Sequence, residues 1–458
     1  MGSCGSKGER PHAVSDSWES SGEEHPHTRM FRTHSLFPPG TRISALLPLS
    51  PGEGGGGGGE VGVGTGDGSI YRLSWKHPQQ QPDGDSGDGG DGGDGGDGDG
   101  DGDDGDGDGG DGGDGDGDGG DGDWGMYETE KEEIGSLGSG IRGLISLPPS
   151  SHTSSQTTMQ TTFGGVLVGL SRRGNLGVYS RQHDTGWDGN QWDQLHDRGC
   201  SALCSLGPHQ SWIASGGRDA RIRVWDLEAS SSGGAGMGLV WDVWRARNLV
   251  TGLGSWHVEG GGGGEEGGNP YLLVQTGEDL AARVWDTRVA SGQGPVLVWS
   301  GLVNIPKCLA VDARHEHVFA TGANGFDGDG CEINMFDLRM PASPLARLEG
   351  AHSQAVRGLS FGPNMDGNPT LISAGADGKV VVSVWGGDDG RAQVVSSVSD
   401  LGSGPLSTLA VCLESRNVYA SGEDGSLFIW RISPSTRLGG DSEEELGLEP
   451  VAAYTNGS

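Results

Sequence analysis

The sequence contains no long apolar run and no closely paired cysteines. No apolar stretch approaches the roughly 18 residues that a membrane-spanning helix needs, and no signal-peptide core follows Met1. The six cysteines of the 458-residue chain include no Cys-x-x-Cys pair, so we predict neither a disulfide framework nor a zinc site. They are Cys4, Cys200, Cys204, Cys308, Cys331 and Cys412. We expect a cytoplasmic protein in which Cys200 and Cys204 lie on one face of a strand as core residues.

Basic residues are scarce. The chain has 30 Lys and Arg against 64 Asp and Glu, for a net charge of -34. Residues 83–123 contain only Asp, Gly and one Ser, and their 18 aspartates leave -16 for the remainder. Because nucleic-acid binding requires a basic surface, this balance argues against a nucleic-acid partner.

Motifs for catalysis are also missing. The sequence shows no nucleophile motif, no phosphate-binding loop in a strand–loop–helix context, no histidine-rich metal spacing and no paired-carboxylate cleft. We therefore predict a protein that is not an enzyme, without catalytic residues, cofactor, metal or small-molecule substrate.

What the sequence does contain is a repeated hairpin. In residues 270–288 the apolar run Tyr271–Val274 leads into a Gly-Glu-Asp turn, and a second run ends on Trp285-Asp286. Two short β-rich runs joined by a tight polar turn are typical of one propeller blade. Seven such units follow one another, and each ends its hairpin on an aromatic residue: Trp75, Tyr179, Trp225, Trp285, Phe336, Trp385 and Trp430. The repeats predict an all-β, seven-bladed propeller over residues 29–458, interrupted at about 78–135.

Acidic residues occupy the same turn in successive units. Asp219, Asp279 and Asp424 precede their aromatic by six positions, whereas Asp377 precedes Trp385 by eight, as does the turn aspartate of the first unit. A carboxylate repeated in every turn is more consistent with accepting backbone N–H groups than with catalysis. The longer spacing predicts either distorted blades or a different register in units one and six.

These hairpins resemble WD-repeat proteins from about residue 41 to the C-terminus. Four segments, residues 273–288, 324–339, 402–411 and 450–454, are similar to a member of this family connected with cilia. The resemblance implies a non-enzymatic WD-repeat propeller that acts in trafficking of the intraflagellar transport machinery and its cargo adaptors. The glycine and Asp/Gly insertions depart from the family pattern.

The N-terminus fits an acylation signal. Met-Gly-Ser-Cys-Gly-Ser places Gly2 for myristoylation and Ser6 at the required hydroxyl position. Because one acyl chain holds a membrane only marginally, palmitoylation of Cys4 would make the attachment stable. Residues 1–28 are then a disordered tether, and we expect a membrane-associated protein, at the cilium or flagellum if the resemblance holds.

The low-complexity insertions suggest which face of the ring is in use. In a propeller blade with strands a to d, the a–b and c–d loops lie on one face and the b–c and d–a loops on the other. We place the runs 52–59, 148–162, 260–264 and 363–369 between strands a and b, and the Asp/Gly tract and the Trp187/Trp192 stretch after strand c. A calcium-binding β-roll is a weaker alternative for the tract, which lacks the apolar position that each such repeat needs. Because insertions are tolerated where nothing docks, we predict that the b–c and d–a face binds other proteins.

Two candidate partner sites follow. The long loop 323–332 carries Phe326 with Asp327, Asp329 and Glu332, an aromatic anchor among acids that suits a basic partner. Alternatively, Trp285-Asp-Thr-Arg288, echoed by Arg339 one unit later, is typical of substrate receptors of cullin-RING ubiquitin ligases, although Arg288 could simply pair with neighbouring acids. The terminal closure of the ring stays open, since either residues 28–36 or residues 450–454 could supply the last outer strand.

Overall fold

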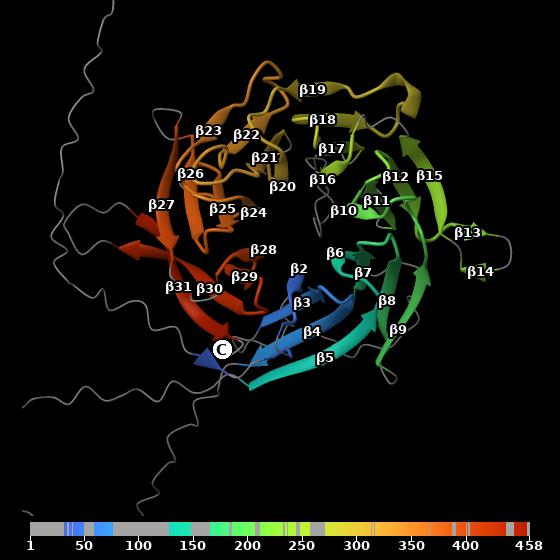
Figure 1. The fold of residues 1–458 in the computed structure, drawn as a ribbon, viewed down its shortest axis with the longest axis horizontal. Helices are drawn as coiled ribbons and strands as arrows, with labels where there is room; N and C mark the ends of the chain where they lie inside the picture. Colours follow the sequence, from blue (N-terminus) through green and yellow to red (C-terminus); the bar gives the residue numbers. More distant parts are fainter. Residues whose placement is uncertain are drawn as a thin grey trace, which may run out of the picture.

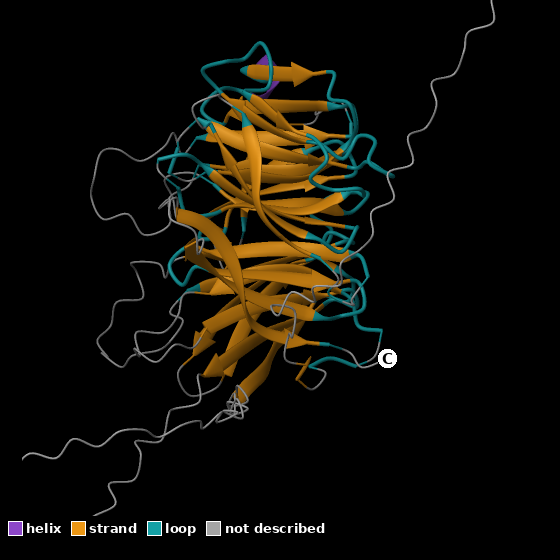
Figure 2. Ribbon diagram, turned by 90° about the vertical axis from the view of Figure 1, so that its left-hand side faces the viewer, coloured by secondary structure: helices purple, strands orange, loops and turns teal. Residues whose placement is uncertain are grey.

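The computed structural model forms a ring of seven sheets, each built on four antiparallel strands (Figure 1). It describes residues 32–33, 36–38, 40–49, 59–76, 128–147, 165–182, 186–206, 211–231, 234–235, 237–243, 248–256, 271–312, 314–315, 317–365, 367–386, 391–399, 401, 404–436 and 444–455. The strands run between the two faces of the ring, where the loops lie (Figure 2). The predicted seven-bladed propeller is confirmed.

Each blade consists of four consecutive strands, innermost first. Blade 1 is β2 (Ile43–Leu49), β3 (Gly59–Thr65), β4 (Ser69–Lys76) and β5 (Glu128–Ser136). Blade 2 is β6 (Ile141–Leu147), β7 (Val166–Ser171), β8 (Leu176–Gln182) and β9 (Gly186–Trp192). Blade 3 is β10 (Cys200–Ser205), β11 (Trp212–Gly217), β12 (Ile222–Asp226) and β15 (Gly238–Val243), with a small hairpin of β13 (Ser230–Ser231) and β14 (Gly234–Ala235) before β15.

The other four blades follow the same order. Blade 4 is β16 (Val250–Ser255), β17 (Leu272–Gly277), β18 (Ala281–Asp286) and β19 (Leu297–Ser300), with the short 3-10 helix η2 (Ser291–Gln293) before β19. Blade 5 is β20 (Pro306–Val311), β21 (Val318–Ala323), β22 (Ile333–Asp337) and β23 (Ala346–Leu348). Blade 6 is β24 (Val356–Phe361), β25 (Thr370–Gly375), β26 (Val380–Trp385) and β27 (Ala392–Val398). Blade 7 is β28 (Leu406–Cys412), β29 (Asn417–Gly422), β30 (Leu427–Thr436) and β31 (Glu444–Tyr454).

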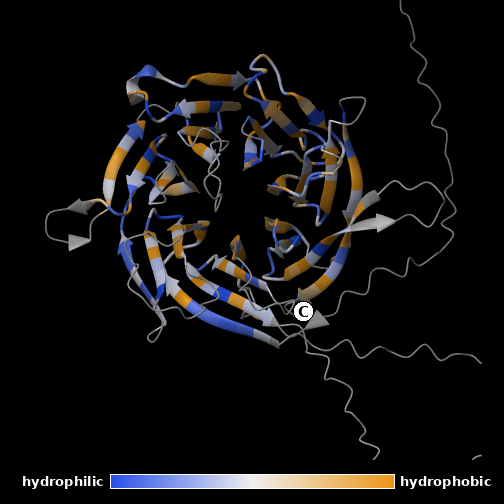
Figure 3. Cartoon of the chain, turned by 180° about the vertical axis from the view of Figure 1, so that it is seen from behind, coloured by the Kyte–Doolittle hydropathy of each residue, from blue (hydrophilic) through white to orange (hydrophobic). Residues whose placement is uncertain are grey.

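The hydrophobic core lies between adjacent blades rather than at the centre of one domain. The second strand of every blade is buried along most or all of its length, because both of its faces meet a neighbouring blade, and such strands read as near-continuous apolar or glycine-rich runs. The outer strands are more exposed, and Glu128–Ser136 of β5 is strongly hydrophilic (Figure 3).

All seven predicted aromatic residues lie on the third strand of their blades. In blade 6 the turn aspartate and the aromatic residue are eight positions apart rather than six, and neither a distorted blade nor a different register is the cause. The turn of blade 6 is closed by Gly375 N–H donating to Lys379 O at 3.0 Å, as Gly217 N–H donates to Arg221 O at 3.0 Å in blade 3. The turns are therefore equivalent, and Trp385 simply lies two residues further along β26. Since side chains alternate with a period of two, it stays on the same face of the strand.

Every innermost strand contains a β-bulge at its second residue: Ser44, Arg142, Ser201, Thr251, Lys307, Arg357 and Ser407. The hydroxyl of Ser44 donates to Ile141 O of the next blade at 2.7 Å, and that of Ser201 donates to Val250 O at 2.5 Å. The bulge thus turns a side chain out of the sheet and links neighbouring blades.

The bulge also corrects the placement of two cysteines. Cys200 packs with Leu195 and Ile213, whereas Cys204 packs against the separate cluster that contains Ala202. They do not share a face of β10, because the extra residue in the bulge inverts the alternation between them. Both remain core residues, as expected.

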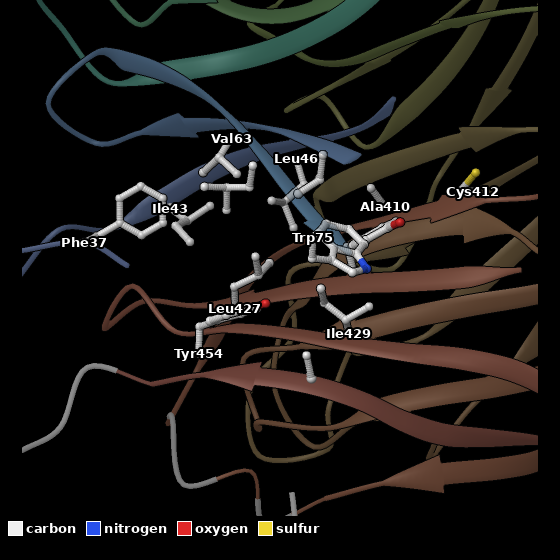
Figure 4. Packing of buried hydrophobic residues seen from close by; sticks show 14 residues of the cluster. Phe37, Ile43, Leu46, Val63, Trp75, Ala410, Cys412, Leu427, Ile429 and Tyr454 are labelled. Carbon is white, nitrogen blue, oxygen red and sulfur yellow. The ribbon is translucent and has the colours of Figure 1, made fainter. Parts of the chain in front are cut away.

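Both ends of the chain close the ring. β31 pairs antiparallel with β30 as the outer strand of blade 7, and β1 (Arg32–Thr33) pairs parallel with β31 as a fifth strand. Between blades 7 and 1, Ile43, Trp75 and Tyr454 share a buried cluster (Figure 4). Both candidate segments are thus used, and the C-terminal one supplies the fourth strand.

Candidate protein-interaction face

The b–c turns and d–a connections, named here the b–c face, are tied together in every blade. The first residue after the second strand donates its N–H to the carbonyl of the residue that precedes the innermost strand, at 2.7–3.1 Å. The donor–acceptor pairs are Gly66–Arg42, Arg172–Gly140, Arg218–Gly199, Glu278–Leu249, Asn324–Ile305, Ala376–Ala355 and Glu423–Pro405. These bonds pair backbone N–H and C=O groups that would otherwise lack a partner within the protein, and they join each b–c turn to the adjacent d–a connection.

In blade 3 the turn aspartate ends a chain of four side chains. Trp225 Nε1 donates to Ser215 Oγ at 2.9 Å, Ser215 Oγ contacts His196 Nε2 at 2.8 Å, and His196 Nδ1 contacts Asp219 at 2.9 Å. We assign the Nδ1–H tautomer, because the carboxylate can only accept. The N–H groups of Asp197 and Arg221 donate to the same carboxylate.

Gly217 makes this chain possible. A Cβ atom at Gly217 would lie 2.2 Å from His196 Nδ1 and 2.3 Å from Asp219 Oδ1. A residue with a side chain at position 217 would therefore clash with the hydrogen bond between His196 and Asp219.

In blade 6 the corresponding hydrogen-bonded side chains form two separate groups. His352 Nδ1 contacts Asp377 at 3.1 Å and Nε2 contacts Ser373 at 2.8 Å, but Trp385 donates instead to Ser383 at 2.8 Å. The two-residue displacement of the tryptophan separates it from the histidine's serine.

Both aspartates are held ionised by this arrangement. Burial alone would raise the pKa of Asp219, but the hydrogen bond from His196, with the charge of Arg223, lowers it below its ordinary value of 3.8. The pKa of Asp377 is lowered in the same way by His352, against the effect of burial. Asp424 accepts the N–H of Ser426 at 2.9 Å, while Asp279 binds the side chain of Arg283. Asp219, Asp377 and Asp424 therefore accept backbone N–H groups as expected, whereas Asp279 instead binds a side chain.

Neither His196 nor His352 was identified as a functional residue from the sequence. Both histidines lie four residues before the innermost strand of their blade and are buried. That shared position, combined with the Gly-x-Asp turn that follows about 20 residues later, is the signal that could have identified them.

The predicted loop 323–332 is a small, braced hairpin on the b–c face. Phe326 and Asp329 exchange N–H···O=C bonds at 3.0 and 3.1 Å. Asp327 and Gly328 between them have φ of 53° and 82°, as the type I′ turn requires. At the base of the loop, a Cβ at Gly325 would lie 2.2 Å from the carbonyl carbon of Gly330.

Blade 6 supports this hairpin from the side. Gly328 N–H donates to Ser353 O at 2.8 Å, and Phe326 forms a β-bridge with Gln354. Phe326 itself is 73% exposed, the most exposed large hydrophobic side chain in the described part of the chain. The loop therefore presents an aromatic ring on a fixed backbone, beside the exposed Asp327 and Asp329.

Glu332 does not belong to this surface. It is only 5% exposed, and its Oε1 has no hydrogen-bond partner among the described residues. The prediction that it is presented with Phe326 was wrong, because Glu332 immediately precedes β22 and its side chain is enclosed where that strand begins.

Arg288 and Arg339 lie on the opposite face, just after the third strands of blades 4 and 5. Arg288 binds Asp286 through Nε at 2.9 Å and Nη2 at 2.7 Å and lies over the ring of Tyr271. Arg339 binds Asp337 through Nε at 2.9 Å and Nη2 at 2.6 Å. Each arginine thus pairs with the aspartate of its own motif, and neither is near the Phe326 loop.

The strand order fixes where the insertions attach. The runs 52–59, 148–162, 260–264 and 363–369 connect the first two strands of their blades, and the Asp/Gly tract connects β4 to β5. The strand ends that flank these insertions all lie on the face opposite the b–c face, as predicted. Trp187 and Trp192 are an exception to the prediction, since they lie within β9 itself.

Several predictions fall on parts of the chain that lie outside the described residues. These are acylation of Gly2 and Cys4, the tether 1–28, and the conformation of the Asp/Gly tract. Among the described residues, no helix is long and apolar enough to cross a membrane, and no group of three or more His, Cys, Asp or Glu side chains is arranged to hold a metal ion.

Residues 194–226 match the family model WD40: WD domain, G-beta repeat. The match spans blade 3 from just before His196 to Asp226, and so contains the complete four-residue chain. Together with the seven blades, it supports placing this protein among the WD-repeat proteins. WD-repeat propellers generally serve as non-enzymatic scaffolds and typically bind other proteins.

Proposed function

We propose that this WD-repeat protein is a non-enzymatic interaction scaffold that binds its partner through the b–c face. The observation that carries the proposal is the Phe326 hairpin. An exposed aromatic ring on a mobile loop would lose conformational entropy on binding. Here the backbone that carries the ring is already fixed, because Phe326 and Asp329 exchange two hydrogen bonds and the hairpin is also hydrogen-bonded to blade 6. Pre-organised aromatic anchors of this kind dominate many protein interfaces.

The charge around the ring defines the partner. Asp327 and Asp329 flank Phe326 and are exposed, so a partner with basic residues around an apolar pocket is favoured. The insertions attach at strand ends on the other face.

The cellular role rests on two further points of the sequence. The segments 273–288, 324–339, 402–411 and 450–454 resemble WD repeat-containing protein 31, which favours a role in ciliary and intraflagellar trafficking. The N-terminal Met-Gly-Ser-Cys-Gly-Ser favours acylation at Gly2 and Cys4. In this proposal acylation confines the scaffold to a membrane, and confinement raises the effective concentration of its partners.

The test compares two exposed apolar residues on opposite faces. Phe326→Ala removes the proposed anchor, and Leu413→Ala, which is 41% exposed in the a–b connection of blade 7, is the matched control. In ciliated cells, proteins labelled in proximity to the full-length chain should lose a specific set with Phe326→Ala and keep that set with Leu413→Ala. Equal melting temperatures would confirm that both variants fold. An unchanged set with Phe326→Ala would refute the use of this face.

A ligase receptor acting through Arg288 and Arg339 is the alternative. Both side chains are exposed, but an adaptor would have to compete with Asp286 and Asp337 for them. This alternative predicts that Arg288→Ala abolishes co-purification of a cullin-RING adaptor, whereas Gly2→Ala has no effect on it. The scaffold proposal predicts that Gly2→Ala releases the protein from membranes while Arg288→Ala leaves membrane recovery unchanged.

A further inference from the structure

Three exposed arginines gather on the b–c face at blades 2 and 3. Arg142 is the bulge residue of β6, Arg172 is the first residue after β7, and Arg218 is the first residue after β11. All three side chains are exposed. This group, named here the arginine cluster, was not recognised in the sequence because its members are 30 and 46 residues apart.

Most other blades carry different residues at the positions of these arginines. Where Arg172 and Arg218 stand, blades 1 and 4–7 carry Gly66, Glu278, Asn324, Ala376 and Glu423. Where Arg142 stands, blades 1, 3 and 7 carry serines whose hydroxyls bond to the next blade, blade 4 carries Thr251, and blades 5 and 6 carry Lys307 and Arg357. The ring does not need arginine at these positions to be built.

The positive charges are close enough to affect one another. Desolvation, followed by the positive charges of Arg172, Arg42 and Arg218, lowers the pKa of Arg142. All of these guanidinium groups still keep their charge at neutral pH. Arg42 is paired with Glu423 at 2.8 Å, but in the part of the chain that the structure describes no carboxylate lies within ion-pair distance of the three cluster arginines.

We propose that the arginine cluster binds an acidic peptide segment of a partner protein. This inference rests on the proposed function and extends it, because it identifies a second part of the b–c face that would contact the partner and the acidic residues that it would bind. Exposed like charges gathered without a counter-ion gain from an incoming anion, and the planar guanidinium matches a carboxylate with two parallel hydrogen bonds. A segment with several carboxylates can satisfy more than one of the three.

A protein ligand is favoured over a nucleic acid by what surrounds the cluster. Glu278 and Glu423 hold the equivalent turn position in blades 4 and 7, and the chain outside the Asp/Gly tract carries a net charge of -16. A long polyanion would be repelled beyond the cluster, whereas a short acidic segment would not.

The experiment measures binding of a fluorescein-labelled peptide of eight glutamates to the full-length protein by anisotropy. Arg172→Ala/Arg218→Ala should weaken binding about tenfold, since the two solvent-exposed charge pairs that are lost are together equivalent to roughly that factor. The control, Arg347→Ala/Arg431→Ala, removes the same charge from exposed positions on β23 and β30 and should leave the affinity within about twofold. Arg172→Lys/Arg218→Lys keeps the charge and should retain an intermediate affinity, and it replaces the alanine pair if that variant does not fold.

Three results would overturn the proposal. Equal weakening by the cluster and control variants would show that only net charge matters. Tighter binding of an eight-residue oligothymidylate than of the peptide would indicate a nucleic-acid surface. Binding that requires deletion of residues 83–123 would identify the chain's own aspartates as the occupant. In each case a set of proximity partners that still depends on Phe326 would leave the proposed function standing.

Discussion

The hydroxyl of Ser407 donates a hydrogen bond to the carbonyl oxygen of Ile43 at 2.6 Å, although 364 residues separate them. Ser407 is the bulge residue of blade 7 and Ile43 begins the innermost strand of blade 1. The same bond joins blade 1 to blade 2 through Ser44, and blade 3 to blade 4 through Ser201. The junction between the two ends of the chain is therefore built like the internal junctions.

We expect Ser407→Ala to destabilise the closed ring. The substitution leaves the carbonyl of Ile43 without its side-chain donor and also removes the contact with Ser421 Oγ at 2.8 Å. The free energy of unfolding should fall by about 1 kcal/mol, measured by urea denaturation. Ser300→Ala, on the exposed end of β19, is the control and should change it by less than about 0.5 kcal/mol. Equal effects of the two variants would contradict a role for Ser407 in closure.

Deletion of residues 448–458 should unfold or strongly destabilise blade 7. The deletion removes most of β31, including the buried Ala452, Ala453 and Tyr454, and uncovers their partners on β30. Exposure of this apolar area should lower the melting temperature by about 10 °C or more. Tyr454→Phe is the mild comparison, since it keeps the buried ring and removes the hydroxyl that shares a hydrogen bond of 2.7 Å with Thr129 of β5. An unchanged melting temperature on deletion would mean that β31 does not close the blade.

Local patterns were readable in the sequence, and contacts between blades were not. The alternation and the repeated aromatics predicted all seven third strands, because each hairpin is specified by residues close together in the chain. The burial of Glu332, the pairing of His196 with Ser215 and the bulge at Ser201 depend on how separate segments pack. For the same reason, the arginine cluster emerges only when blades 2 and 3 are side by side.

The four-residue chain of blade 3 should stabilise the fold. Asp219→Ala leaves the buried His196 Nδ1 without its acceptor and frees two backbone N–H groups, a loss of about 1–3 kcal/mol in unfolding free energy. Asp193→Ala, an exposed aspartate three residues before His196, is the matched control. A loss no larger than that of the control would show that the chain of hydrogen bonds is not what holds the turn.

The same aspartates should make stability depend on pH in the acid range. The folded-state pKa values of Asp219 and Asp377 lie below the ordinary 3.8, since their histidine partners outweigh burial. A carboxyl with a depressed folded pKa contributes stability above its unfolded value and loses it as pH falls through the folded value. The unfolding free energy should therefore drop steeply below about pH 4, and Asp219→Asn should flatten this drop. An Asp219→Asn profile parallel to that of the wild type would contradict the assignment.

The cysteines offer a direct test of the acylation signal. Burial raises the pKa of Cys200, Cys204 and Cys308 to about 12, so that at pH 8 only about one thiol in ten thousand is ionised. Iodoacetamide should leave these three unmodified in the native protein and label them after denaturation, as read by peptide mass spectrometry. Cys4 lies outside the described residues and reacts at an ordinary rate if it is a free thiol. In protein from its native cell we expect Cys4 to resist labelling until hydroxylamine cleaves a thioester, whereas Cys4→Ser should show no such release. Prompt labelling of Cys4 without hydroxylamine would exclude stable palmitoylation and leave membrane attachment to Gly2 alone.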